Sequence, residues 1–187
     1  MRITPPTRRS SSRQTSDGVQ ISLPAKRNIF LMLFLAAWLV GWCFGEVFAT
    51  RELLFGRNEE PILFLGAWLV GWTIGGGFAL YSWCWMLRGR EVIALRTDTL
   101  VTRRDLWGLG RSREYDLLHV KNLRVAPMTW NPYDWSGGMQ FWGLGGGPIA
   151  FDYGSRTVRF GSGLDEPEAR EIVQELRSRH AFPGAAG

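Results

Sequence analysis

Four arginines surround one tryptophan in residues 103–113, a stretch that could hold an anionic group. The five residues are Arg103, Arg104, Trp107, Arg111 and Arg113. A guanidinium group makes paired hydrogen bonds to carboxylate or phosphate oxygens, and an indole with basic neighbours suits the surface of an anionic membrane. Acidic residues interleave with the arginines, so a solvated strand face is the alternative. We therefore expect contact with lipid headgroups here, or a plain basic surface.

Aromatic side chains are concentrated in residues 127–148, PMTWNPYDWSGGMQFWGLGGGP. The candidates for partner contact are Trp130, Tyr133, Trp135, Phe141 and Trp142. Buried aromatic anchors dominate binding at interfaces, and the glycines let a loop adapt to its partner. Packing of these rings on the core is the alternative. No Gly-Lys-Ser/Thr follows, which argues against a phosphate loop.

Residue types exclude several other chemistries. The two histidines, His119 and His180, lie outside the apolar runs, so haem held by two membrane histidines is excluded. Cys43 and Cys84 stand alone, which argues against a metal cluster or a disulfide framework. No catalytic triad or carboxylate pair can be assembled. We expect no enzyme activity, no cofactor and no metal.

Two apolar runs must position these candidates. Of the 39 charged residues only six lie between positions 29 and 87, and five of these lie in the connection at 51–60. Residues 29–50 and 62–87 are each long enough to cross a bilayer. The sequence therefore predicts two transmembrane helices that form an antiparallel hairpin over residues 28–88.

Glu46 is the only charged residue inside either run. Burying an unpaired carboxylate in a bilayer is costly, which makes Glu46 a functional candidate. It lies close to the outer end of its run. We expect a structural role, with Glu46 bonded to a hydroxyl such as Thr73, to an indole or to Arg51. Proton or ion handling is the alternative.

The two runs are copies of each other. LFLAAWLVGWCFGEVFA at 33–49 and LFLGAWLVGWTIGGGFA at 63–79 are identical at 12 of 17 positions. Each copy carries a pair of glycines four residues apart: Gly41 and Gly45, then Gly71 and Gly75. Small residues at this spacing let membrane helices approach closely. We expect the pairs to face each other within the hairpin, with self-association as the alternative.

The flanking charges orient the hairpin. Six basic residues and one acidic residue precede the first helix, and Arg88 and Arg90 follow the second. Basic residues favour the cytoplasmic side. We expect a multi-pass protein of the bacterial inner membrane with both termini in the cytoplasm. Residues 1–27, rich in Ser, Thr, Arg and Pro, are predicted to be a disordered basic tail, with a short ordered patch at 19–23 as the exception.

Residues 89–180 are predicted to form a small cytoplasmic domain. Six short segments rich in β-branched and aromatic residues, between 91 and 161, are typical of antiparallel strands. Asp165, Pro167 and Glu168 then begin an amphipathic helix, and residues 181–187 are predicted to be flexible. The expected fold is α+β: a membrane hairpin, then a partly open barrel or sheet that this helix closes.

This order of elements resembles the bacterial pleckstrin-homology-like membrane proteins. The similar parts are the apolar pair, Arg-Gly-Arg-Glu-Val at 88–92, Tyr-Asp-Leu at 115–117 and the two segments at 151–154 and 157–161. The resemblance covers about 28–180 and implies an architecture rather than an activity. Segment 127–148 departs from it as a long insertion. The basic hairpin at 103–113 is similar to the one with which some pleckstrin-homology domains hold lipid headgroups.

The sequence favours a non-enzymatic role in a membrane. We expect an anchored interaction module or accessory subunit that contacts the lipid bilayer and either a protein partner or further copies of itself, and no nucleic acid. The alternative is an oligomeric transport or channel component in which Glu46 lines a pathway.

Overall fold

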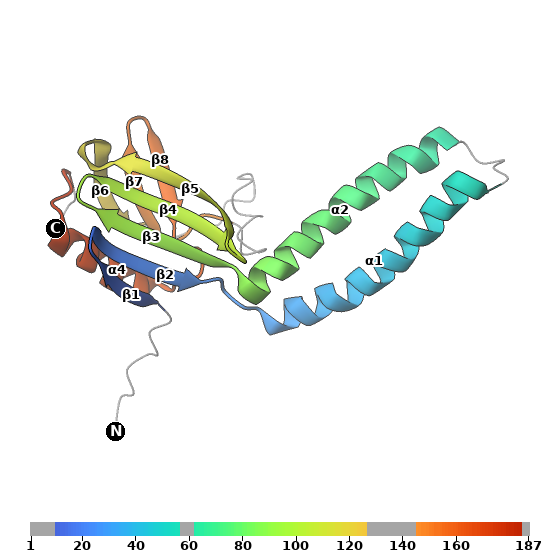
Figure 1. Cartoon of the computed structure of the whole chain (residues 1–187), viewed down its shortest axis with the longest axis horizontal. Helices are drawn as coiled ribbons and strands as arrows, with labels where there is room; N and C mark the ends of the chain where they lie inside the picture. Colours follow the sequence, from blue (N-terminus) through green and yellow to red (C-terminus); the bar gives the residue numbers. More distant parts are fainter. Residues whose placement is uncertain (1–9, 57–61, 127–144, 185–187) are drawn as a thin grey trace, which may run out of the picture. The chain divides into compact units, whose positions relative to one another are not determined.

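The computed structural model describes residues 10–56, 62–126 and 145–184. They form an α+β chain with two compact units: one is the helical hairpin, and the other is a sheet unit built from both ends of the chain (Figure 1). The five aromatic residues predicted to contact a partner, Trp130, Tyr133, Trp135, Phe141 and Trp142, lie outside the described residues.

The helical unit consists of α1 (Ile29–Phe55) and α2 (Ile62–Arg88). The side chain of Asn28 caps α1 by accepting the Leu31 N–H at 3.2 Å. At 1.5 Å per residue each helix is about 40 Å long, more than the ~30 Å of a bilayer core. Both are apolar enough to cross a membrane, and only 11% of the apolar window of each is buried, unlike the core helix of a soluble protein. Both predicted helices are confirmed, and α1 continues five residues further than expected.

A five-stranded antiparallel sheet begins the second unit. Its strands, in spatial order, are β1 (Ser11–Thr15), β2 (Gly18–Pro24), β3 (Arg90–Arg96), β4 (Thr99–Leu106) and β5 (Leu109–Asp116). The prediction that residues 1–27 form a disordered tail is therefore wrong for residues 11–24. In β2, Val19, Ile21 and Leu23 are buried while Gln20 is exposed, the alternation of a half-buried strand. The patch expected at 19–23 is the core of this strand.

The hairpin is inserted between two paired strands of this sheet. Residues 18–24 of β2 pair with residues 90–96 of β3, and the ladder continues with Ala25 N–H donating to Gly89 O at 2.9 Å. The chain thus leaves the sheet after Pro24 and returns at Arg90, which is the directly opposite residue. Both ends of the hairpin therefore connect to the same end of one sheet.

A second, three-stranded antiparallel sheet contains β6 (Val120–Val125), β7 (Ile149–Tyr153) and β8 (Arg156–Phe160), and a 3₁₀ turn (Leu117–His119) precedes it. Helix α4 (Glu166–Arg179) follows, with the Asp165 side chain accepting the Glu168 N–H at 3.1 Å as predicted. All six predicted strands are present. Among the described residues β5 and β8 do not pair with each other, so the sheets do not close into a barrel.

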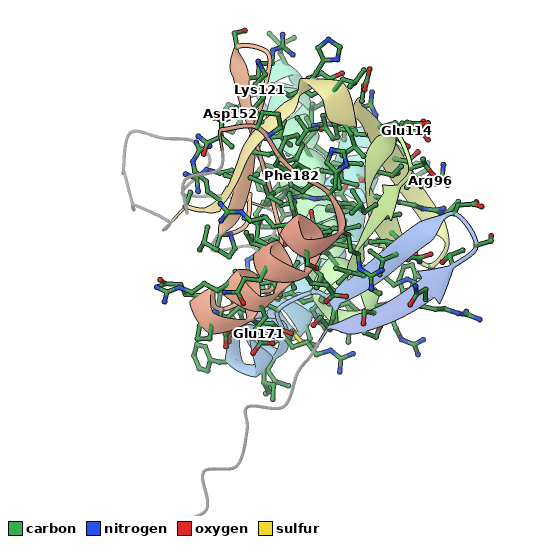
Figure 2. The ribbon with its side chains drawn as sticks, turned by 90° about the vertical axis from the view of Figure 1, so that its left-hand side faces the viewer. Arg96, Glu114, Lys121, Asp152, Glu171 and Phe182 are labelled. Atoms are coloured by element: carbon green, nitrogen blue, oxygen red, sulfur yellow. The ribbon has the colours of Figure 1, made fainter. Side chains whose placement is uncertain are left out.

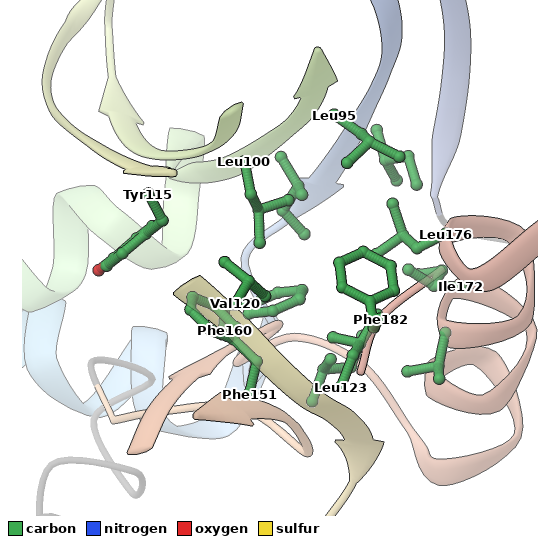
Figure 3. Packing of buried hydrophobic residues seen from close by; sticks show 14 of the residues in the cluster. Leu95, Leu100, Tyr115, Val120, Leu123, Phe151, Phe160, Ile172, Leu176 and Phe182 are labelled. Carbon is green, nitrogen blue, oxygen red and sulfur yellow. The ribbon is translucent and has the colours of Figure 1, made fainter. Parts of the chain in front are cut away.

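The core lies between the two sheets and α4 (Figure 3). It includes the buried face of α4, whose members are Ala169, Ile172, Val173 and Leu176. The prediction of a flexible C-terminus is wrong for residues 181–184, because Phe182 is 7% exposed and packs in this core, and Pro183 O accepts the Asn122 N–H at 2.8 Å. Charged side chains such as Arg96, Glu114 and Lys121 project from the outside of the unit (Figure 2).

Candidate functional site

The inner face of the five-stranded sheet changes from apolar to charged along its strands. Its apolar part contains Ile93, Leu100 and Tyr115, all in the core. Side chains alternate along a strand, so Thr102 and Arg104 lie on the same face as Leu100. By the same rule Arg111 and Arg113 share the face of Tyr115, and Glu91 shares that of Ile93. The inward face is therefore basic at the end from which the hairpin leaves.

These inward residues line a cleft of about 280 Å³ between the two sheets, here called the arginine cleft. Its lining residues are Glu91, Thr102, Arg104, Arg111, Arg113, Tyr115, Gly146, Val158, Arg159 and Phe160. Four arginines face one carboxylate, and Tyr115, Val158 and Phe160 supply an apolar wall. The cleft is thus a concave surface with an excess of positive charge.

Glu91 fixes one wall of the arginine cleft. It is 5% exposed, and its Oε2 accepts the N–H groups of Gly161 and Ser162 at 2.8 and 3.2 Å. Its Oε1 lies 3.9 Å from Arg104 Nε, and Arg104 Nη2 donates to Gly145 O at 3.0 Å. Glu91 and Arg104 are therefore structural members of the wall, each held by several partners.

The other three arginines of the cleft have few or no partners among the described residues. Within the described parts of the chain, Arg111 and Arg113 have no ion pair and no hydrogen bond. Arg159 makes one long contact, from Nη1 to Ala126 O at 3.4 Å. Guanidinium groups without protein partners around a concave surface can bind carboxylate or phosphate oxygens through paired hydrogen bonds.

Arg103, the fourth arginine of the predicted cluster, lies on the opposite face of the sheet. There Arg90 Nε and Arg103 Nη2 donate to the two oxygens of Asp105 at 2.6 and 3.1 Å. Asp105 is 3% exposed, and the hydrogen bond from Arg90 is the largest of the effects that lower its pKa. Arg103 Nη2 also donates to Gly108 O at 2.8 Å. The charge of Arg103 is thus engaged within the fold.

Trp107 lies in the tight turn between β4 and β5, and its ring is exposed. Trp107 and Gly108 have φ values of 53° and 84°, the left-handed pair that a two-residue hairpin turn requires. Glycine adopts this conformation freely, but a tryptophan in it costs about 1 kcal/mol or more. Asp105 pairs with Arg90, so the turn lies at the end of the sheet to which the hairpin connects.

The expected contact between the glycine pairs is not formed within the hairpin. A Cβ built on Gly41, Gly71 or Gly75 meets nothing within 4 Å, and one on Gly45 makes only ordinary contact with Trp72 at 3.5 Å. The close approach occurs at Gly76, where a Cβ would lie 1.9 Å from Trp42 Cε2. Trp42 Nε1 also donates to Trp72 O at 3.1 Å. An indole therefore fills the gap between the helices, and the backbones stay too far apart for glycine–glycine contact.

Glu46 bonds to Thr73, as expected. The Thr73 hydroxyl donates to Glu46 Oε1 at 2.6 Å. Glu46 Oε2 and Trp72 Nε1 are buried atoms without a hydrogen-bond partner. Position 46 corresponds in the repeat to Gly76, so a carboxylate in one copy replaces the glycine that receives Trp42 in the other.

The structure brings together three of the five residues predicted to contact lipid, Arg104, Arg111 and Arg113, and separates Arg103 and Trp107 from them. Glu91 and Arg159 also line the cleft but are not predicted from the sequence. Strand alternation could have placed Glu91 on the inner face, whereas Arg159 joins the cleft only because the second sheet packs against the first. Comparison of the chain with protein-family models, with curated proteins and with solved structures finds no match.

Proposed function

We propose that this protein is a membrane-anchored interaction module without enzymatic activity, whose sheet unit binds an anionic partner in the arginine cleft. The observation that carries the proposal is the set of three arginines, Arg111, Arg113 and Arg159, that face a concave surface with little or no compensation from the described residues. All three residues are exposed, so their guanidinium groups are accessible to an anionic ligand that enters the cleft.

The insertion of the hairpin supports the role of anchor. If α1 and α2 cross a bilayer, strands on both sides of the insertion belong to one sheet and must lie on one side of the membrane. The basic flanks favour the cytoplasmic side of a bacterial inner membrane. With Cys43 and Cys84 replaced, a cysteine introduced at Ser155 should react with an impermeant maleimide only after the inner membrane is opened. Reaction in intact spheroplasts would show that the sheet unit lies on the outer side of the membrane and would contradict the proposed orientation.

The turn at Trp107 supports contact between the sheet unit and the bilayer. It lies at the end of the sheet to which the hairpin connects, and Trp107 and Leu109 are 60% and 81% exposed. Tryptophan is favoured at the level of lipid headgroups, where its ring is half apolar and its N–H can hydrogen bond. We propose that this turn rests on the headgroup layer, which holds the arginine cleft close to the membrane.

The test is equilibrium binding of fluorescent polyglutamate to the full-length protein in nanodiscs of zwitterionic lipid. Replacing Arg111, Arg113 and Arg159 together by Ala should weaken binding at least tenfold, because the loss removes three charge-assisted contacts. Arg179→Ala, on the exposed end of α4, is the matched control and should bind like the wild type. Equal affinity for the triple variant and the control would refute the proposed site.

A further inference from the structure

A second cavity adjoins the arginine cleft and runs between the edges of β5 and β8; we call it the seam. It has a volume of about 640 Å³ and is lined by residues 113–115, Tyr153 and residues 156–159. Arg113, Tyr115, Val158 and Arg159 line both the seam and the arginine cleft. The two cavities are therefore adjacent and share one wall.

The seam is bounded by strand edges and not by strand faces. Side chains alternate between the two faces of a strand, so a face contributes every second residue to a cavity. Here three consecutive residues of β5 and four consecutive residues of β8 line the same cavity. Consecutive residues share a surface only along the edge, where the backbone itself is presented.

Both edges carry unused backbone hydrogen-bonding groups. In the described parts of the chain β5 pairs only with β4, and β8 pairs only with β7. An open edge presents a row of N–H and C=O groups that can pair with an added strand. The five residues of β8 cover about 17 Å at ~3.3 Å per residue, which is enough for a short extended segment.

The charge of the residues that line the seam determines which kind of extended segment can pair with its edges. Arg113, Arg156 and Arg159 face Glu114 alone in the seam, and Arg104 and Arg111 extend the basic surface into the cleft. A second copy of β8 would place its own Arg156 and Arg159 against the arginines of the seam. Like charges on neighbouring strands destabilise pairing. An acidic segment places carboxylates against the guanidinium groups.

We propose that the seam binds an extended acidic peptide segment of a protein partner, which adds as a strand to the edge of β5 or β8. Backbone hydrogen bonds supply affinity, the arginines select Glu and Asp, and Tyr115 and Val158 receive apolar side chains between them. This inference rests on the proposed function and names the chemistry of the partner.

Three labelled nine-residue probes test the inference by fluorescence polarisation with the full-length protein in zwitterionic nanodiscs. The first alternates Glu with Val and Thr. The second has the same sequence with N-methyl groups along one edge, which removes backbone donors but keeps the charge, and the third has Gln for Glu. The first should bind at least tenfold more tightly than either of the others. It should also slow amide hydrogen exchange in residues 111–115 or 156–160.

The variants separate failure of this inference from failure of the proposed function. Arg113→Ala with Arg159→Ala should weaken the first probe at least tenfold, and Arg179→Ala should not. Equal binding of the first two probes, or arginine-dependent binding of phosphatidylglycerol vesicles without peptide binding, would overturn strand addition and leave anion binding intact. No arginine-dependent binding of the peptides, polyglutamate or vesicles would overturn both.

Discussion

At the scale of single residues, two carboxylates, one buried and one half-buried, hold basic side chains of the sheet unit in place. Asp105 receives two arginines on the outer face, while Asp152 receives Arg124 Nη1 at 2.9 Å and the Thr157 hydroxyl at 2.8 Å. The hydrogen bond from Arg124 is the first cause of the lowered pKa of Asp152, as that from Arg90 is for Asp105. Each carboxylate is therefore more stable ionised in the folded protein than in the unfolded chain.

The lowered pKa values predict a loss of stability in acid. The contribution is fully present above the ordinary aspartate pKa of 3.8 and is lost as the pH falls through the lower pKa of the folded state. Asp105→Asn should cost about 2 kcal/mol at pH 7 and flatten the pH dependence of unfolding below pH 4. Urea unfolding followed by circular dichroism at pH 7 and pH 3 measures both effects. Asp98→Asn, at an exposed turn, is the control; an unchanged acid slope in Asp105→Asn would contradict the assignment.

The sequence indicates these residues only in part. Residue type and spacing identified a basic stretch at 103–113, and alternation on β4 and β5 divides it between the two faces of the sheet. Arg159 could not be joined to it, because its place depends on how the second sheet packs on the first. The bond from Thr73 to Glu46 was predictable, since a carboxylate within an apolar run needs a hydrogen-bond donor from the neighbouring helix.

At the scale of elements, the helical hairpin is packed by tryptophan against glycine. Gly76→Ala should destabilise it by about 1–3 kcal/mol, because the new methyl group would overlap the indole of Trp42 and disturb its bond to Trp72 O. Gly41→Ala is the matched control, since a methyl group there meets open space within the chain. Thermal unfolding in detergent should show a lower Tm for Gly76→Ala alone. Equal Tm values would mean that the indole is not held in this gap.

The elements themselves were largely predictable, for a physical reason. Long apolar runs and alternating segments are local signals, and they located both long helices, six strands and the Asp165 cap. Strand β1 is polar and fully exposed, so it carries no such signal. Strand β2 carries the alternation, but its partner β3 lies beyond the whole hairpin, and local reasoning could not supply the pairing. The prediction of glycine–glycine contact between the helices is wrong because the bulk of the Trp42 indole sets the distance between them.

At the scale of the whole molecule, both ends of the hairpin connect to one end of the five-stranded sheet, and the proposed anchoring predicts that the turn at this end contacts the membrane. A spin label at Trp107→Cys should be shielded from water-soluble nickel reagents and accessible to oxygen, as expected at the headgroup layer. A label at Asp98→Cys, in the turn at the opposite end of the sheet, should be accessible to the nickel reagent. Equal accessibility of the two labels in nanodiscs would show that the turn does not contact the bilayer.

The central claim is that arginines facing the space between the two sheets bind an anionic partner. The most direct measurement is the ¹H–¹⁵N spectrum of the arginine Nε–H groups of the full-length protein in nanodiscs, recorded while polyglutamate is added. The signals of Arg111, Arg113 and Arg159 should shift together and saturably, while that of Arg179 stays in place. Shifts spread evenly over all arginines, or confined to residues outside the cleft, would contradict the claim.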